Sequence, residues 1–153
     1  MTLLSVRDDK AMRALGARLA EVCQLGAIIY LVGELGAGKS TLARGFLRAL
    51  GHEGSVRSPT YTLVESYDLP VGHIYHLDLY RLADPEELAF LGLRDWLTGH
   101  AILLVEWPQR GEGVLPLADV TVTIVYDGKA RGVTVMASSE KGRQIVAALV
   151  EQR

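Results

Sequence analysis

The chain has 153 residues, about the length of one domain, with 49% hydrophobic and 22% charged residues. This composition is typical of a globular protein and excludes a disordered or collagen-like chain. The 16 Lys and Arg residues are balanced by 18 Asp and Glu residues, and the net charge of -2 argues against direct binding of nucleic acid. Any contact with RNA is therefore expected to run through a partner.

The apolar runs of the chain are short. The longest ones, residues 27–32 and 101–105, are far below the roughly 20 residues that a membrane-spanning helix needs. The N-terminus lacks the basic and apolar segments of a secretory signal, and the one cysteine, Cys23, cannot form an internal disulfide. These features predict a cytoplasmic protein without a membrane segment, organised as a single domain over residues 1–153.

The first half of the chain predicts a helix, a strand and a second helix. Apolar residues spaced by three and four from Met12 to Cys23 predict a first helix that ends near Gly26. Residues 27–32 are apolar without alternation and rich in β-branched side chains, which predicts a central parallel strand buried on both faces. A glycine-rich loop follows, and then an amphipathic helix that ends at Gly51.

The second half of the chain predicts two hairpins, a further buried strand and more helices. A helix is expected to start around Pro85, with Asp84 as its cap and Pro85 at its first position, and a short amphipathic piece surrounds Trp96. The predicted strands are residues 61–68, 73–80, 101–105, 120–126 and 131–137, and the closing helix surrounds residues 145–150. Together these elements predict an α/β fold with a mixed parallel and antiparallel sheet and helices on its faces.

The loop after residues 27–32 matches the phosphate-binding pattern GxxxxGK[ST]. Its glycines let backbone N–H groups approach phosphate oxygens, Lys39 would contact the β and γ phosphates, and the hydroxyl of Ser40 would bind Mg²⁺. The strand before it and the helix after it are the context that this motif requires, so the sequence predicts a P-loop NTPase-like three-layer domain. The candidate nucleotide-binding residues are Gly33, Glu34, Leu35, Gly36, Ala37, Gly38, Lys39, Ser40 and Thr41.

Two acidic residues are candidates to complete the site. Glu106 follows the apolar run 101–105 and is expected at the end of a strand, where it could hold Mg²⁺ and activate the attacking water, or simply end the strand. Asp78 would share a strand face with His76, and either a metal or water contact or a salt bridge would explain it. His73 and His76 would point to opposite faces of that strand, which argues against a zinc site.

Two further segments could contact the nucleotide. The turn-prone segment 58–60 lies where P-loop proteins carry a switch that senses the γ phosphate, although a plain connecting turn would look the same. Arg131, in the second hairpin, could also reach the nucleotide.

The class of nucleotide protein is narrowed by what the sequence lacks. There is no Asn-Lys-x-Asp guanine motif, which argues against a GTPase. A small kinase would need an arginine-rich lid, and only Arg110 lies between Glu106 and Arg131. A kinase is therefore the weaker alternative, and a binding module switched by nucleotide without obligatory hydrolysis is the main rival to an ATPase.

These motifs resemble the TsaE (YjeE) family, the ATPases of bacterial tRNA threonylcarbamoyladenosine biosynthesis. The likeness rests on residues 33–41, 58–65, 75–88 and 104–107, and it covers roughly residues 26–117. The long central motif within residues 75–88 is much more specific than the phosphate loop. Ser40 stands where many relatives have Thr, and either hydroxyl can bind Mg²⁺.

The resemblance implies a function and a set of partners. ATP and Mg²⁺ would be the cofactors, and hydrolysis would sustain turnover of a complex of the proteins TsaD and TsaB. Contact with the ANN-decoding tRNA would be indirect, through that complex. Because no arginine finger is evident in the sequence, hydrolysis is expected to be slow in the isolated protein and faster with the partners.

The resemblance also implies roles for individual residues. Lys39 and Ser40 would carry phosphate and Mg²⁺, and Glu106 would serve the metal and the attacking water. The remaining roles are support of the γ phosphate by Asp78 and Thr60, a second metal contact by Asp78, and a place near the nucleotide for Asp9 and Arg131.

Overall fold

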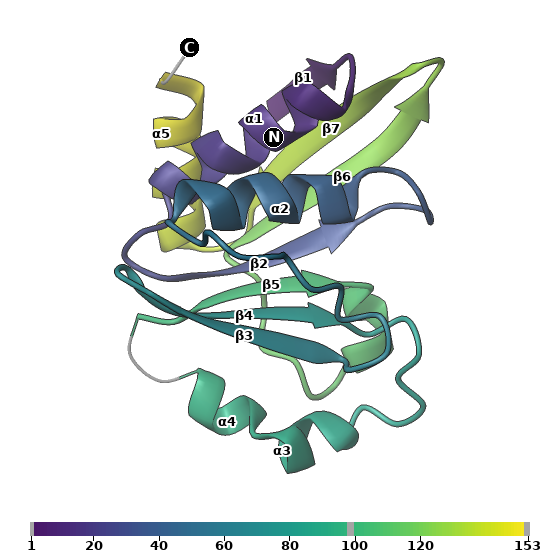
Figure 1. The fold of residues 1–153 in the computed structure, drawn as a ribbon, viewed down its shortest axis with the longest axis vertical. Helices are drawn as coiled ribbons and strands as arrows, with labels where there is room; N and C mark the ends of the chain where they lie inside the picture. Colours follow the sequence, from purple (N-terminus) through teal and green to yellow (C-terminus); the bar gives the residue numbers. More distant parts are fainter. Residues whose placement is uncertain (1, 98–99, 152–153) are drawn as a thin grey trace.

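A seven-stranded mixed sheet runs through the molecule (Figure 1). The structure is a computed structural model that describes residues 2–97 and 100–151. The strands are β1 (Thr2–Val6), β2 (Ala27–Val32), β3 (Val64–Leu69), β4 (Gly72–Asp78), β5 (Ile102–Glu106), β6 (Val120–Asp127) and β7 (Ala130–Ala137). Their order across the sheet is β1-β7-β6-β2-β5-β4-β3, which puts β2 at the centre as predicted.

The sheet is parallel in its middle and antiparallel towards both edges. Strand β2 pairs in parallel with both β5 and β6, and β5 also pairs in parallel with β4. The two hairpins, β3-β4 and β6-β7, and the edge pair β1-β7 are antiparallel. The mixed sheet expected from the sequence is therefore confirmed.

Helices cover the sheet on both faces, as the three-layer prediction required. One hydrophobic core joins the sheet to α1 (Asp9–Glu21), α2 (Lys39–Ala49) and α5 (Glu140–Glu151). A second core, on the opposite face, joins it to the short helices α3 (Glu87–Leu91) and α4 (Leu93–Trp96). Within the described ranges, no helix is both long enough and apolar enough to span a membrane.

The unbroken apolar runs belong to strands that contribute to both cores. In β5 all five residues are buried: Leu104 lies in the core beneath α2, and its neighbour Leu103 lies in the core beneath α3 and α4. Because alternate strand residues point to opposite faces, a strand covered on both sides presents apolar residues to both, as residues 102–105 of β5 do. Cys23 also lies in the first core, where burial raises the pKa of its thiol to about 12.

Helices α1 and α2 cross at unusually close range. A Cβ atom added to Gly45 would lie 2.1 Å from the backbone oxygen of Arg13, and one added to Gly16 would lie 2.1 Å from the backbone oxygen of Leu42. Only residues without a side chain fit at these two positions. The pair of glycines therefore fixes the position of α2, whose first residue is Lys39.

Two sequence predictions need correction, and one strand was missed. Strand β1 was not predicted, because its backbone partners lie in β7 at the far end of the chain. The first hairpin is shorter than predicted: residues 61–63 form a turn in which the N–H of Leu63 donates to the oxygen of Pro59, and Leu63 adopts φ of 68°. Helix α3 begins at Glu87, after Pro85, because Asp84 first forms a turn by accepting from the N–H of Glu86.

Candidate functional site

The glycine-rich loop connects β2 to α2, in the strand, loop and helix order that the motif requires. Gly36 and Gly38 have φ of 80° and 122°, a region that side chains disfavour. A Cβ on Gly33 would lie 2.7 Å from the backbone oxygen of Ile124, so the loop starts tightly against β6. The first turn of α2 carries Ser40 and Thr41, and the unpaired N–H groups there form a favourable environment for phosphate.

Lys39 is buried at the start of α2, with 5% of its surface exposed. Its ammonium donates a hydrogen bond to the backbone oxygen of Gly33 and lies 4.1 Å from the centre of the Trp107 ring. Desolvation lowers the pKa of this lysine, and the nearby carboxylates of Glu106 and Asp78 oppose that shift. Burial deprives the ammonium of water, and the negative charge of a bound phosphate group would compensate for that loss.

Asp78 and Glu106 are directly opposite one another on β4 and β5. Both side chains are buried, on the face of the sheet that α2 covers. Burial is the main reason why the pKa of Asp78 is raised, and the charge of Glu106 adds to it, while the N–H of Tyr80, which donates to Asp78 Oδ1, opposes it. The parallel pairing thus joins two acids that are far apart in sequence.

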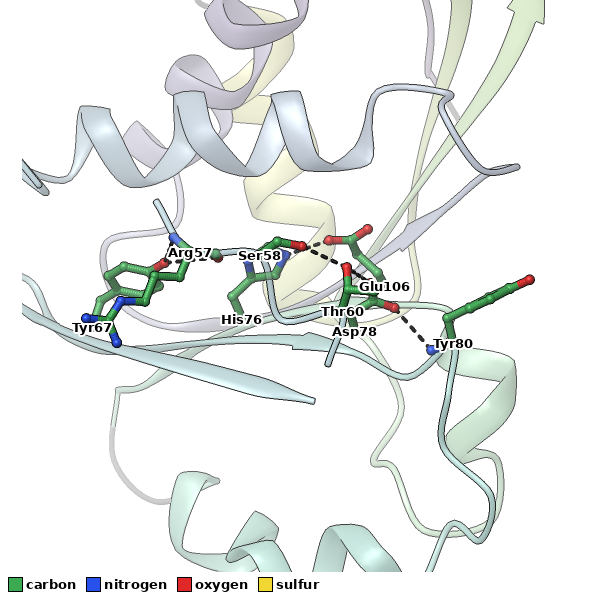
Figure 2. A network of polar contacts seen from close by, with 8 residues as sticks. All are labelled: Arg57, Ser58, Thr60, Tyr67, His76, Asp78, Tyr80 and Glu106. Atoms are coloured by element: carbon green, nitrogen blue, oxygen red, sulfur yellow. Dashed lines mark hydrogen bonds and ion pairs between the residues drawn. The ribbon is translucent and has the colours of Figure 1, made fainter. Parts of the chain in front are cut away.

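His76 is the polar contact of Glu106 (Figure 2). Its Nε2 lies 2.6 Å from Glu106 Oε2, and both side chains are almost completely buried. The sequence pointed to His76 only as a neighbour of Asp78 on one strand face, and nothing in the sequence related it to Glu106. The link depends on the register of β4 against β5, which pairs His76 with Leu104.

The segment 57–60 passes in front of these acids (Figure 2). The hydroxyl of Thr60 lies 3.5 Å from Asp78 Oδ2 and 2.7 Å from the hydroxyl of Ser58. At the other end of the segment, the N–H of Arg57 donates to the hydroxyl of Tyr67. The structure therefore brings Thr60 next to Asp78.

Asp9 and Arg131 line a common hollow of about 210 Å³ beside the loop. The guanidinium of Arg131 donates to the backbone oxygen of Ala37, and its plane lies over Tyr126, whose hydroxyl donates to the backbone oxygen of Leu35. Hairpin β6-β7 thus holds the loop from one side. The hollow is also lined by Arg7, Asp8 and Lys129, which the sequence did not point to, and by Met12, Gly36, Ala37, Gly38 and Thr41.

Trp107 adopts a left-handed conformation directly after β5, with φ of 55°. Its ring contacts the ammonium of Lys39 and packs 4.9 Å from the ring of Tyr80. It also lines a second hollow, of about 540 Å³, together with Gly33 and Glu34 of the loop. Trp107 therefore separates the lysine of the loop from this larger hollow.

The donor set fits a nucleotide with Mg²⁺. The carboxylates of Asp78 and Glu106 and the hydroxyl of Ser40 are oxygen ligands of the kind that Mg²⁺ prefers. The ammonium of Lys39 and the N–H groups of the loop supply positive potential for phosphate. The arrangement can therefore bind a chain of phosphate groups, with the carboxylates of Asp78 and Glu106 near the ammonium that would contact it.

Replacing Asp78 with Asn is expected to stabilise the nucleotide-free protein at pH 7. Because its pKa is raised from 3.8, Asp78 holds its proton more tightly in the folded state, so stability is lost as the pH rises through the raised value. Asn removes the charge but still accepts from Tyr80. We expect the melting temperature to rise by about 2 to 4 °C, equivalent to roughly 1 kcal/mol.

The stabilisation by Asn should disappear as the pH falls below 3.8, because the wild-type carboxyl is then protonated in both the folded and the unfolded state. Asp127→Asn, at an exposed site, is the control and should leave the melting temperature nearly unchanged. A lower melting temperature for Asp78→Asn at pH 7 would mean that the charged carboxylate stabilises the fold.

The chain resembles known proteins along most of its length. The family model for the threonylcarbamoyl adenosine biosynthesis protein TsaE matches residues 6–133. The tRNA threonylcarbamoyladenosine biosynthesis protein TsaE of Haemophilus influenzae is 46% identical over 148 residues, covering 94% of each chain, and that of Bacillus subtilis is 37% identical over 121 residues, covering 79% of this chain and 73% of the relative.

The fold agrees with these matches. A crystal structure of Bacillus subtilis YdiB superimposes with a TM-score of 0.85 at 26% identity, covering 99% of this chain and 95% of YdiB. The P-loop NTPase-like fold expected from the sequence is thereby confirmed. From the family model and from identity over nearly its whole length, the chain belongs to the TsaE family of tRNA threonylcarbamoyladenosine biosynthesis proteins.

Proposed function

We propose that this chain is a Mg²⁺-dependent ATPase that acts on a complex of TsaD and TsaB during tRNA threonylcarbamoyladenosine biosynthesis. The observation that carries the proposal is the meeting of Lys39, Asp78 and Glu106 at the end of the phosphate loop, from α2, β4 and β5. Burial of an ammonium and two carboxylates is unfavourable for folding. The phosphates of ATP would pair with the ammonium, and Mg²⁺ would pair with the carboxylates.

Each residue has a defined task in hydrolysis. The N–H groups of the loop and the ammonium of Lys39 bind the β and γ phosphates and stabilise the charge that develops on them. When bound, Mg²⁺ neutralises phosphate charge, and Ser40, Asp78 and Glu106 are the residues that would hold it. Glu106 orients the attacking water and accepts its proton, and Thr60 lies beside Asp78, where it can respond to the γ phosphate.

The hollow beside Asp9 and Arg131 provides a place for the rest of the nucleotide. It contains the N-terminus of α1, with Asp8 and Asp9, and the backbone of Gly36 to Gly38, and its positive groups are Arg7, Lys129 and Arg131. Positive side chains next to the loop suit the α and β phosphates or the ribose hydroxyls. We assign this hollow to the nucleotide in preference to the larger one beside Trp107, because it carries the basic groups.

The partners explain how a chain of this charge can serve a tRNA modification. A net charge of -2 offers no general attraction for RNA, so TsaD and TsaB would hold the tRNA. Within residues 2–97 and 100–151, no arginine hydrogen-bonds to Asp78 or Glu106 or forms an ion pair with either. A group supplied by a partner could stabilise the transition state, as arginine fingers do in trans, so partners are expected to accelerate hydrolysis.

The test is steady-state ATP hydrolysis by the purified chain, alone and with its cognate TsaD and TsaB. Lys39→Ala is the blank, since it removes the phosphate-binding ammonium. We expect slow hydrolysis alone, stimulation of about tenfold or more by the partners, and loss of both in the variant. Fast hydrolysis in isolation that the partners leave unchanged would contradict the proposal.

A further inference from the structure

His76 is buried with a single polar contact. Only 2% of its surface is exposed, and its Nε2 donates to Glu106 Oε2 at 2.6 Å. The other ring nitrogen, Nδ1, is buried too, and no described residue forms a hydrogen bond with it. The ring therefore makes its one hydrogen bond to the residue to which we assign the activation of water.

A histidine at this position is unfavourable for folding alone. Its neighbours Ile74 and Leu104 lie in the apolar core beneath α2, and its Nδ1 has no hydrogen-bond partner among the described residues. Replacing both members of a buried polar pair with apolar residues is often neutral for stability, so packing alone does not require His76 and Glu106 at these two positions. The position of His76 is thus better explained by what it does for Glu106 than by packing.

Glu106 has a competing partner in Lys39. The carboxylate of Glu106 is close enough to the ammonium of Lys39 to raise the pKa of the lysine, which opposes the effect of burial. Within the described part of the chain, however, Lys39 forms no ion pair with Glu106 or Asp78, and it donates to Gly33 instead. The bond from His76 holds one carboxylate oxygen, which keeps the side chain from turning onto the ammonium and leaves Oε1 available.

We infer that His76 is a positioning residue: its Nε2–H holds Glu106 in the orientation that activates water for ATP hydrolysis. The inference rests on the proposed function, because it assumes that Glu106 serves hydrolysis. Groups that orient a reacting side chain by one hydrogen bond contribute about 10- to 100-fold to activity in comparable settings.

The experiment compares three substitutions that differ in where they place a donor. His76→Leu removes the donor. In His76→Gln the amide nitrogen reaches about as far as Nε2, and in His76→Asn it reaches only as far as Nδ1. Measurements on the full chain are kcat and KM for ATP with Mg²⁺, the Kd for ADP without Mg²⁺, and the melting temperature.

The expected result separates positioning from packing. kcat should fall about tenfold or more in the Leu and Asn variants and stay within about threefold of wild type in the Gln variant. KM and the ADP affinity should change by less than about threefold in all three, since the described residues of the loop form no hydrogen bond with His76. Two polar variants of similar stability would then differ in kcat alone, which a purely structural role does not produce.

Three outcomes would overturn the inference. A Leu variant that hydrolyses ATP at the wild-type rate, while Glu106→Gln is inactive, would show that Glu106 needs no positioning by His76 and would leave the proposed function intact. A wild-type chain that does not hydrolyse ATP, alone or with TsaD and TsaB, would remove the proposed function and this inference together. Equal loss of kcat in the Gln and Asn variants, with a lowered melting temperature in both, would assign His76 to packing.

Discussion

Glu106→Gln is expected to lower kcat for ATP hydrolysis by about 100-fold or more while ATP binding is retained. Glutamine has nearly the same shape as glutamate, and its amide oxygen can still accept the hydrogen bond from His76. It cannot take a proton from water or offer a negative charge to Mg²⁺. The loss should therefore appear in kcat, with the Kd for ATP within about threefold of wild type.

Titration with ATP and steady-state hydrolysis, both with TsaD and TsaB present, would measure the two effects. Glu112→Gln is the matched control, because this glutamate is exposed on the loop that follows residues 108–111, and it should behave as wild type. Unchanged hydrolysis in Glu106→Gln would remove the role that we propose for this acid.

The same variant separates an ATPase from a nucleotide-switched binding module. If turnover of ATP drives the pathway, Glu106→Gln should bind ATP and fail to support formation of threonylcarbamoyladenosine on tRNA. If ATP and ADP only change the affinity of the chain for a partner, modification of the tRNA should continue although hydrolysis is lost. Reconstituted modification with the TsaD and TsaB proteins would distinguish the two.

Gly45→Ala is expected to destabilise the fold by about 1 to 3 kcal/mol. Alanine normally favours a helix by up to about 1 kcal/mol over glycine, so the usual direction is reversed here. The reason is the contact with α1: the added carbon would lie 2.1 Å from the backbone oxygen of Arg13, and backbone atoms cannot turn aside as a side chain can. The two helices would have to move apart.

Thermal or urea unfolding checks this expectation, with a fall in melting temperature of about 2 to 4 °C for each kcal/mol. Gly54→Ala is the control, since the nearest atoms to an added carbon there lie 3.7 Å away, on the side chain of His52. ATP affinity should also fall in Gly45→Ala, because a displaced α2 moves Lys39. A Gly45→Ala protein as stable as wild type would show that the crossing can widen at no cost.

The sequence was informative where the chemistry is local. The glycine loop, the helix that follows it and the strand end at Glu106 all lie within short segments whose patterns predict them, and the structure has these elements in the same order. The hairpin at residues 127–128 was equally local. For these parts, a few consecutive residues carry the whole signal.

The remaining features depend on contacts between distant segments. Asp78 meets Glu106, and His76 meets the same acid, only because β4 pairs with β5 in one particular register, which no local pattern encodes. The contact of Trp107 with Lys39 could not be predicted either, because it needs both a left-handed backbone at Trp107 and the position of α2. Strand β1 has no turn or alternation that would mark it, and its pairing comes from β7.

The pairing of β1 with β7 has a consequence for how the protein is made. Thr2 pairs with Val135 and Val6 with Arg131, so β1 leaves the ribosome well before its neighbour β7 has been synthesised. β1 lies at the edge of the sheet, so β7 is its one neighbour. During synthesis the helices α1 and α2 and the central strands can associate first, whereas residues 2–6 must wait until the second hairpin has emerged. Strand β1 is thus fixed late although it is synthesised before β7, and a ribosome that stops before residue 131 releases a protein in which β1 has no partner strand.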